Sequence, residues 1–335
     1  MRTAIVGAGL QGNRRASALR LSDGDRLLLV ADSDAEAAQR LAQEYGCRAT
    51  QRWQNVIEAE EVEAVLVCTP PHLHAAISVA AMEGGRHVLC EKPLGRTPAE
   101  AQAIVEAAAG NGVKLKCGFN HRYFPAIRQA KAWCCQGAIG ELLFVRCRYG
   151  IGGRPGYETE WRAQPELSGG GELMDQGLHA LDLARWFLGD FREAFGYTTR
   201  SFWQVEAEDN AFVMLRTAER RVASLHVSWT QWKNLFSFEV FGKLGAIEVS
   251  GLGGSYGTQK VSLVPNLPGA PFQEETIEYR GKDPSWQEEW QDFADAIETG
   301  REPLASGADG LAALRLAHAV YTSGRAGALV RVDNP

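Results

Sequence analysis

Three ionisable side chains recur at helical spacing in the segment 169–188, which reads GGGELMDQGLHALDLARWFL. On an α-helix, Asp175, His179 and Asp182 fall within roughly 60° of one another, and apolar residues cover most of the remaining surface. Such a histidine with nearby carboxylates can move a proton and bind a substrate hydroxyl. A buried histidine held by two carboxylates for structural reasons fits the pattern equally well. Other parts of the chain are needed to choose between these interpretations.

A second motif that can do chemistry stands at the start of the chain. Residues 2–6 (RTAIV) form an apolar run typical of a buried parallel strand, and a GxGxxG sequence follows. Its six residues are Gly7, Ala8, Gly9, Leu10, Gln11 and Gly12. The glycines permit a tight turn and a close approach of backbone to a pyrophosphate, and the next helix presents N–H donors to phosphate. The following strand-like run, LLLVAD, ends in Asp32, where dinucleotide-binding folds place a ribose-binding carboxylate.

Asp32 also bears on the choice of cofactor. A carboxylate accepts hydrogen bonds from a free ribose 2′-hydroxyl and repels a 2′-phosphate. Ser33 and Asp34 follow, with no arginine to hold such a phosphate. These residues favour NAD as the cofactor. Arg14 and Arg15 lie nearby in the sequence and keep NADP open as the less favoured alternative.

Strand and helix patterns alternate through the first 120 residues. Strands are expected at 2–6, 27–32, 64–67, 86–89 and 113–117, and helices at 13–21, 34–45, 74–83 and 98–110. This alternation predicts a doubly wound parallel sheet, an α/β Rossmann domain. Ligands of such sheets bind beyond the carboxyl ends of the strands.

Polar residues follow three of these predicted strands. They are TPPHLH (69–74), EKP (91–93) and NHR (120–122). Lys92 comes directly after a buried strand, where its ammonium can hydrogen-bond a substrate oxygen beside a nicotinamide; a solvated loop charge is the alternative. His72 and His74 are poorly spaced for a shared metal ion, and the seven cysteines lack CxxC spacing, so no metal site is expected.

The composition limits the class of protein. A chain of 335 residues, 45% hydrophobic and 23% charged, is typical of a soluble protein with about two domains. A net charge of −6 without long basic runs argues against nucleic acid or an anionic membrane as partner. The N-terminal MRTAIVGAG indicates a strand entering a turn and not a signal peptide. The cysteines indicate free thiols, so we expect a cytoplasmic protein.

The second half of the chain shows period-two alternation from residue 142 onward. The runs LLFVRCRY, EAFGYTTRSF, AFVMLRT, VASLHVSW, FSFEVFG and AIEVSG are mostly separated by short polar or glycine turns. Runs joined in this way predict a mostly antiparallel sheet. We expect one sheet face to pair subunits into a homo-dimer or homo-tetramer. Substrate specificity is expected from the loop 150–165 and the sheet face, with a sugar contact in the turn 229–234.

In combination, GAGLQG, TPPHLH, EKP and GGGELMDQGLH resemble the Gfo/Idh/MocA oxidoreductases, in that family's order and across nearly the whole chain. The resemblance implies an N-terminal Rossmann domain, residues 1–120. It also implies a C-terminal domain, residues 121–335, built on a large, mostly antiparallel open sheet. The last helices, near 284–299 and 307–324, are expected to pack back on the Rossmann domain.

The resemblance carries Lys92, Asp175 and His179 over as catalytic residues, with Lys92 beside the nicotinamide. The other residues it places near the cofactor are Thr69, Pro70, His74, Glu91, Asn120, Trp161 and Arg162. Trp286 stands where many relatives have a tyrosine near the nicotinamide. Relatives often have arginine after the position of Asn120, where this chain has His121.

These residues predict an NAD-dependent dehydrogenase that acts on a secondary alcohol of a sugar, a cyclitol or a sugar derivative. His179 is expected to take the hydroxyl proton, Lys92 to stabilise the developing negative charge, and Asp175 to hold the substrate or orient the acid–base pair. Two alternatives remain open. One is a redox-neutral enzyme that uses NAD transiently for glycoside cleavage or elimination, and the other is a non-enzymatic sensor or regulator.

Overall fold

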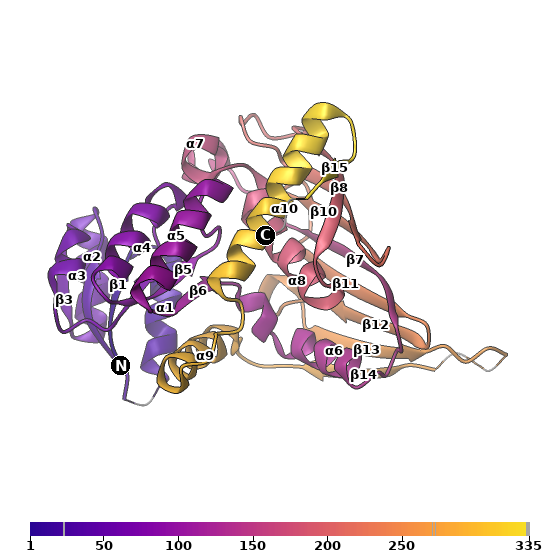
Figure 1. Cartoon of the computed structure of the whole chain (residues 1–335), viewed down its shortest axis with the longest axis horizontal. Helices are drawn as coiled ribbons and strands as arrows, with labels where there is room; N and C mark the ends of the chain where they lie inside the picture. Colours follow the sequence, from indigo (N-terminus) through magenta and orange to yellow (C-terminus); the bar gives the residue numbers. More distant parts are fainter. Residues whose placement is uncertain (23, 270, 272, 333–335) are drawn as a thin grey trace. The chain divides into compact units, whose positions relative to one another are not determined.

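The computed structural model describes residues 1–22, 24–269, 271 and 273–332, and their contacts divide the chain into two units (Figure 1). The first unit comprises Met1–Asn120 and Ser285–Leu311. The second comprises His121–Pro284 and the chain from Ala312 onward. Each unit is built around its own sheet.

The first unit contains a six-stranded parallel sheet in the order β3-β2-β1-β4-β5-β6. Its strands are β1 (Arg2–Val6), β2 (Arg26–Ala31), β3 (Arg48–Thr50), β4 (Ala64–Val67), β5 (His87–Glu91) and β6 (Leu115–Gly118). The predicted Rossmann fold is therefore confirmed. The short strand β3 was not predicted, because three residues with no buried side chain carry no hydrophobic periodicity.

Helices follow the strands of this unit in the predicted alternation. They are α1 (Leu10–Arg20), α2 (Ala35–Tyr45), α3 (Gln54–Glu58), α4 (His74–Glu83), α5 (Pro98–Asn111) and α9 (Ser285–Thr299). The five-residue helix α3 was not predicted. Asp34 caps α2 by accepting the N–H groups of Glu36 and Ala37, and the Thr97 hydroxyl caps α5 by accepting the N–H of Glu100. The late helix α9 packs on α1 and adds Trp290 and Phe293 to the core.

The second unit contains a nine-stranded sheet in the order β14-β13-β12-β11-β7-β10-β9-β8-β15. Its strands are β7 (Leu142–Gly150), β8 (Phe191–Thr199), β9 (Asn210–Thr217), β10 (Val222–Ser228), β11 (Leu235–Gly242), β12 (Gly245–Ser250), β13 (Gln259–Pro265), β14 (Glu275–Tyr279) and β15 (Val330–Arg331). Every pairing is antiparallel except that of β7 with β10. The predicted mostly antiparallel sheet is confirmed.

Helices cover one face of this second sheet, with α6 over β12–β14 and α8 over β7 and β10. The helices after β6 are α6 (Pro125–Cys135), α7 (Pro165–Ser168), the π-turn Leu173–Gly177, α8 (Leu178–Leu188) and α10 (Gly307–Ala326). Short 3₁₀ segments lie at Pro71–Leu73, Asn120–Tyr123, Tyr157–Thr159, Trp161–Ala163 and Gly254–Tyr256. Along β9, buried residues alternate with exposed ones, so the opposite face of the sheet carries exposed side chains.

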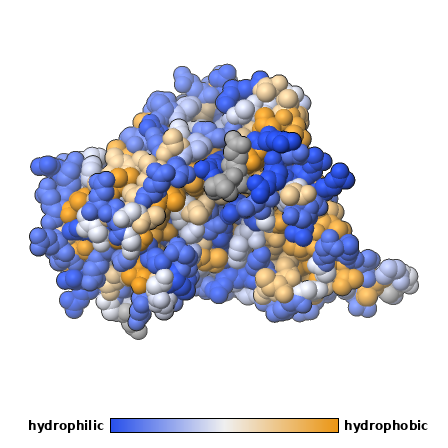
Figure 2. Space-filling view, viewed as in Figure 1, coloured by the Kyte–Doolittle hydropathy of each residue, from blue (hydrophilic) through white to orange (hydrophobic). Residues whose placement is uncertain are grey.

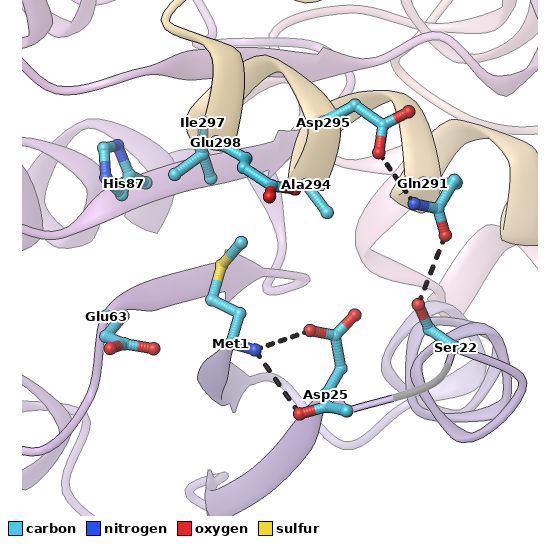
Figure 3. Close-up of a pocket in the computed structure, with 11 residues that line it drawn as sticks. Met1, Ser22, Asp25, Glu63, His87, Gln291, Ala294, Asp295, Ile297 and Glu298 are labelled. Atoms are coloured by element: carbon cyan, nitrogen blue, oxygen red, sulfur yellow. Dashed lines mark hydrogen bonds and ion pairs between the residues drawn. The ribbon is translucent and has the colours of Figure 1, made fainter.

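A pocket of about 490 Å³ opens in the first unit at the amino-terminal ends of its strands (Figure 3). Met1, Asp25 and Glu63 line it and immediately precede β1, β2 and β4. The Met1 ammonium donates to Asp25 at 2.7 Å. Because ligands of parallel sheets bind at the carboxyl ends, this pocket is not the cofactor site.

Among the described residues, no helix combines the length and the apolar character needed to cross a lipid bilayer. On the face drawn in Figure 2, hydrophilic side chains surround separate hydrophobic patches. The exposed surface in this view is therefore mixed in character and not dominated by one apolar area.

Candidate functional site

The glycine turn after β1 has the shape of a dinucleotide cradle. A Cβ on Gly7 would lie 2.6 Å from the carbonyl carbon of Cys68, and a Cβ on Gly12 would lie 1.9 Å from the carbonyl oxygen of Gly7. A Cβ on Gly9 would meet nothing within 4 Å. Packing thus requires glycine at positions 7 and 12. Gly9 instead leaves open space beside the first turn of α1, as a bound pyrophosphate requires.

Asp32 lies next to this turn. Its Oδ2 accepts the N–H of Ala8 at 2.6 Å, and its Oδ1 accepts the N–H of Asp34 at 2.9 Å. The two bonds fix the carboxylate between the glycine turn and the end of β2, the place of the ribose-binding acid in dinucleotide folds. Ser33 beside it is exposed.

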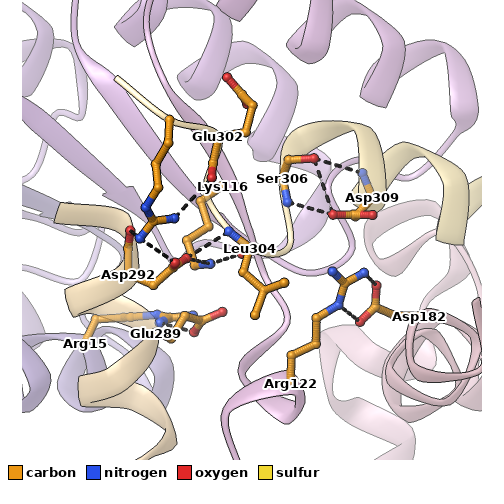
Figure 4. A network of polar contacts seen from close by, with 11 residues as sticks. Arg15, Lys116, Arg122, Asp182, Glu289, Asp292, Glu302, Leu304, Ser306 and Asp309 are labelled. Atoms are coloured by element: carbon orange, nitrogen blue, oxygen red, sulfur yellow. Dashed lines mark hydrogen bonds and ion pairs between the residues drawn. The ribbon is translucent and has the colours of Figure 1, made fainter. Parts of the chain in front are cut away.

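Arg15 of α1 is fully buried and held by two carboxylates. Its Nε and Nη2 donate to Oε1 of Glu91 at 2.8 and 2.5 Å. Its Nη1 donates to Oε2 of Glu289 at 2.5 Å, and Figure 4 shows Arg15 beside Glu289. Burial by itself lowers the pKa of the guanidinium, but the two carboxylates outweigh it and raise the pKa. Arg15 is therefore a structural residue that ties α1 to β5 and α9. The N–H donors that form these hydrogen bonds are directed to carboxylates and not to a 2′-phosphate. Of the two arginines, Arg14 is the exposed one.

Trp286 of α9 lies against the same arginines. The guanidinium carbons of Arg14 and Arg15 are 5.3 and 4.6 Å from its ring centroid, within the range of cation–π contact. The ring also packs against the core cluster of the first unit. The ring of Trp286 therefore packs against α1, the helix that follows the glycine turn.

His74 joins the segments that follow β4 and β5. Its Nε2 lies 2.8 Å from the carbonyl oxygen of Thr69, and its Nδ1 lies 2.7 Å from that of Pro93. Burial lowers the pKa of this imidazole, although both carbonyl contacts oppose the shift. Through these two contacts, His74 holds the segment after β4 and the segment after β5 together. The second segment includes the partly exposed Lys92. The hydroxyl of Thr69 is buried without a hydrogen-bond partner among the described residues, as expected of a group that faces a ligand.

Asn120 ends the first segment of the first unit and is engaged by α9. Its Nδ2 donates to the hydroxyl of Ser285 at 3.0 Å, and its side chain is buried. This contact joins the chain just after β6 to the start of α9. No local pattern in the sequence could have shown it, because the two residues are 165 positions apart.

Asp175 and His179 lie on a helix whose first turn is not α-helical. The turn Leu173–Gly177 has π-helical hydrogen bonds, so the angles derived from an ideal α-helix do not hold for Asp175. Its Oδ2 lies 3.6 Å from Nε of Arg162. Through this ion pair, the predicted Trp161–Arg162 segment lies beside Asp175. π-Turns of this kind are frequent at functional sites.

His179 stacks on a second imidazole, that of His121. The ring centroids are 3.7 Å apart and the planes differ by 22°. Nε2 of His121 lies 3.0 Å from the hydroxyl of Tyr149, whose pKa is raised well above its usual value by burial. Both histidines are almost completely buried. His121 was noted in the sequence only as a departure from relatives, because its stacking depends on segments that are 58 residues apart coming together in the fold.

Asp182 has a different partner. Its two oxygens accept Nη2 and Nε of Arg122 at 2.6 and 2.8 Å, and both side chains are buried (Figure 4). The guanidinium carbon of Arg122 also lies 5.3 Å from the ring centroid of Trp186. This geometry is that of a buried structural ion pair.

Trp229, expected in a sugar-binding turn, is fully buried and packs with Tyr157 and Ala207. Its ring centroid is 4.8 Å from that of Tyr157 in an edge-to-face arrangement. The exposed aromatic of this turn is Trp232, 67% of whose surface is accessible. Trp229 is therefore a core residue, and Trp232 has the surface that a sugar ring would need.

The predicted site residues are distributed over both units. Lys92 belongs to the first unit, and Asp175 and His179 belong to the second. Of the predicted cofactor residues, those that belong to the first unit are Gly7, Gly9, Leu10, Gln11, Gly12, Asp32, Ser33, Thr69, Pro70, His74, Glu91, Asn120 and Trp286. Trp161 and Arg162 belong to the second unit.

Comparison with known proteins assigns both halves of the chain to one family. Residues 1–119 match the profile described as "Oxidoreductase family, NAD-binding Rossmann fold", and residues 127–248 match the GFO/IDH/MocA C-terminal domain. The chain is 30% identical over 249 residues to a levoglucosan dehydrogenase of Pseudarthrobacter phenanthrenivorans, covering 65% of this chain and 63% of that protein. It is 28% identical to an inositol 2-dehydrogenase of Rhizobium meliloti over 96% of both.

A solved structure of levoglucosan dehydrogenase in complex with NADH is similar over 100% of both chains, with a TM-score of 0.91 and 25% identity. The sequence match to the first-named relative, by contrast, spans less than two thirds of that protein, 63% of its length. The two family matches together nonetheless cover most of the present chain. As its motifs predicted, the chain belongs to the Gfo/Idh/MocA family of oxidoreductases.

Proposed function

We propose that this protein is an NAD-dependent dehydrogenase that moves a hydride between nicotinamide and a secondary alcohol or ketone of a sugar, a cyclitol or a sugar derivative. The observation that carries the proposal is the placement of Asp175 and the nearly buried His179 on one helix. The dinucleotide cradle of the first unit supports it. The relatives named levoglucosan dehydrogenase and inositol 2-dehydrogenase support the substrate class.

NAD, when bound, supplies the hydride acceptor. His179 takes the proton of the reacting hydroxyl as general base. Its stacking on His121 restricts the rotation of its ring, which keeps the base in one orientation. Lys92 donates a hydrogen bond to the same oxygen and stabilises its developing charge. Asp175, oriented by Arg162, accepts a hydrogen bond from a second substrate hydroxyl.

A fluorimetric screen of sugars, inositols and nucleotide sugars with NAD and NADP in parallel tests this function. We expect NADH to accumulate with at least one polyol, and NAD to be preferred because Asp32 repels a 2′-phosphate. Turnover of a glycoside without net NADH would identify the redox-neutral reaction instead. Tight binding of NAD without turnover of any compound would identify a sensor or regulator.

We also propose that the protein forms a homo-oligomer through the uncovered face of the second unit's sheet. Phe212 and Met214 of β9 are 47% and 45% exposed there, and Tyr197 pairs with Phe212 across the strands. The ring of Phe212 stacks on that of His226 at 4.2 Å. A sheet face with neighbouring exposed apolar side chains is typical of a surface that pairs with a second copy.

Met214→Arg is expected to shift the protein toward the monomer mass of 36.6 kDa, because a buried unpaired charge opposes association. Light scattering coupled to size exclusion measures this shift. Leu244→Arg is the control, since Leu244 is 59% exposed in the turn between β11 and β12. A wild-type protein that is already monomeric at high concentration would exclude this surface as an interface.

We propose a cytoplasmic location. All seven cysteines occur as free thiols, and Cys90, Cys117 and Cys147 are buried as small apolar side chains. Free cysteines in this number are typical of a reducing compartment.

A further inference from the structure

The glycine run before the Asp175–His179 helix makes room for two side chains from distant parts of the second unit. Gly169 has φ +86 and ends α7. A Cβ on Gly170 would lie 2.1 Å from the hydroxyl oxygen of Tyr321. A Cβ on Gly171 would lie 2.1 Å from the carbonyl oxygen of Glu208 and 2.8 Å from its carboxyl carbon. The last two glycines are therefore required by the close approach of Tyr321 and Glu208.

Glu208 accepts the first N–H groups of the helix. Its Oε2 accepts the N–H of Gly171 at 2.9 Å, and its Oε1 accepts that of Leu173 at 3.0 Å. Its carbonyl oxygen accepts the N–H of Glu172 at 3.0 Å. The first N–H groups of a helix have no acceptor within it, and an anion is favoured at this end of the helix dipole. One residue thus satisfies three successive donors.

Tyr321 of α10 holds Glu208 in turn. Its hydroxyl donates to Oε1 of Glu208 at 2.7 Å, and the carboxylate is almost completely buried. Burial raises the pKa of Glu208, while Tyr321 and the two backbone donors oppose the shift. The carboxylate is therefore fixed from both sides, by the helix it caps and by α10.

We propose that Glu208 and Tyr321 are positioning residues that fix the start of the Asp175–His179 helix for catalysis. This inference rests on the proposed dehydrogenase function. Leu173, held by Glu208, lies two residues before Asp175, and both belong to the π-helical turn Leu173–Gly177. Single π-turns are frequent at functional sites, and here Glu208 fixes the residue with which the turn begins. Misplacement of a reacting group by about 1 Å can slow a reaction by about 10²-fold.

The test compares Glu208→Gln and Tyr321→Phe with Ser323→Ala. Ser323 is a buried residue of the same helix, but its hydroxyl accepts the N–H of Gly196 at 3.1 Å and donates to the carbonyl of Ala328 at 2.7 Å. Tyr321→Phe and Ser323→Ala each remove one hydrogen-bonded hydroxyl from α10, so their losses of stability should be similar. Only Tyr321→Phe releases Glu208.

Tyr321→Phe and Glu208→Gln are expected to lower kcat by about 10- to 10²-fold, with the KM for NAD unchanged and a larger primary deuterium isotope effect on hydride transfer. Ser323→Ala should retain the wild-type kcat and isotope effect. Equal losses of kcat in Tyr321→Phe and Ser323→Ala would overturn the positioning role. If Glu208→Gln does not fold, the comparison of the two α10 variants decides.

Hydrogen exchange of the apoprotein separates this inference from the proposed function. We expect the amides of Gly171 and Leu173 to exchange faster in Tyr321→Phe than in Ser323→Ala, whatever the substrate is. If these amides keep wild-type protection in Tyr321→Phe, the anchor is wrong. If protection is lost as expected but the wild-type protein turns over no polyol, the anchor stands and the dehydrogenase function fails.

Discussion

His179→Ala is expected to lower kcat by about 10²–10⁴-fold, the usual contribution of a positioned general base. The KM for NAD should change little, because His179 belongs to the second unit and the dinucleotide cradle belongs to the first. Steady-state kinetics with the substrate found in the screen measures the effect. Added imidazole should restore part of the activity, since the cavity left beside His121 has the shape of the lost ring.

His87→Gln is the matched control for this substitution. His87 is a half-buried histidine at the amino-terminal end of β5, where its Nδ1 accepts the N–H of Lys114 at 2.9 Å. Its kcat should remain within about twofold of wild type, because it lies away from the carboxyl ends of the strands. A His179→Ala protein with wild-type kcat would exclude His179 as the base.

Arg122→Met is expected to reduce the free energy of unfolding by about 3–5 kcal/mol, because it leaves the buried carboxylate of Asp182 without its countercharge. Asp182 is 1% exposed and Arg122 is 2% exposed, so water cannot replace the lost partner. Denaturant unfolding followed by fluorescence and circular dichroism measures the loss. The transition of the second unit is the relevant one, since both residues belong to it.

Removing both charges should recover most of the stability that Arg122→Met loses. We expect the double variant Arg122→Met/Asp182→Leu to be close to wild type, since apolar side chains can replace a buried ion pair at little cost. Arg216→Met is the exposed control: Arg216 pairs with Glu193 at the surface, and its loss should cost less than about 1 kcal/mol. A double variant as unstable as Arg122→Met would show that the pair is not the source of the effect.

The same double variant separates the structural role of Asp182 from a catalytic one. If Asp182 only pairs with Arg122, a protein that regains its stability should also regain its kcat. The sequence grouped Asp182 with Asp175 and His179 as one stripe of a helix. The structure assigns Asp182 to Arg122 and Asp175 to Arg162, so the stripe serves two different partners.

The sequence alone was sufficient for the features that depend on local pattern. Alternating strands and helices, a glycine turn after β1 and a carboxylate at the end of β2 predicted the Rossmann fold, because each depends on backbone conformation and nearby hydrophobic periodicity. Strands with clear alternation, such as β9, were also predicted correctly. Four strands were not predicted: β13 and β14, and the short strands β3 and β15, whose three and two residues carry no period.

The π-turn was likewise beyond the sequence. The residues LMDQG have no propensity that distinguishes a π-turn from an α-turn. The first residue of the turn, Leu173, donates its N–H to the carboxylate of Glu208, which is distant in the sequence. The parallel pairing of β7 with β10 also depends on how distant strands come together. Short-range patterns predict that a strand exists, but not its neighbour in the sheet.

Only the tertiary structure decided which charged residues bind one another. Arg15 meets Glu91 and Glu289 across 76 and 274 positions, and Tyr321 meets Glu208 across 113. The sequence determined the fold class, the family and a set of residues whose side chains can take part in catalysis or cofactor binding, because these follow from local spacing. It left Arg15 as a candidate for phosphate and did not single out Glu208, because a side chain's partner depends on the directions of elements that pack together only in the folded chain.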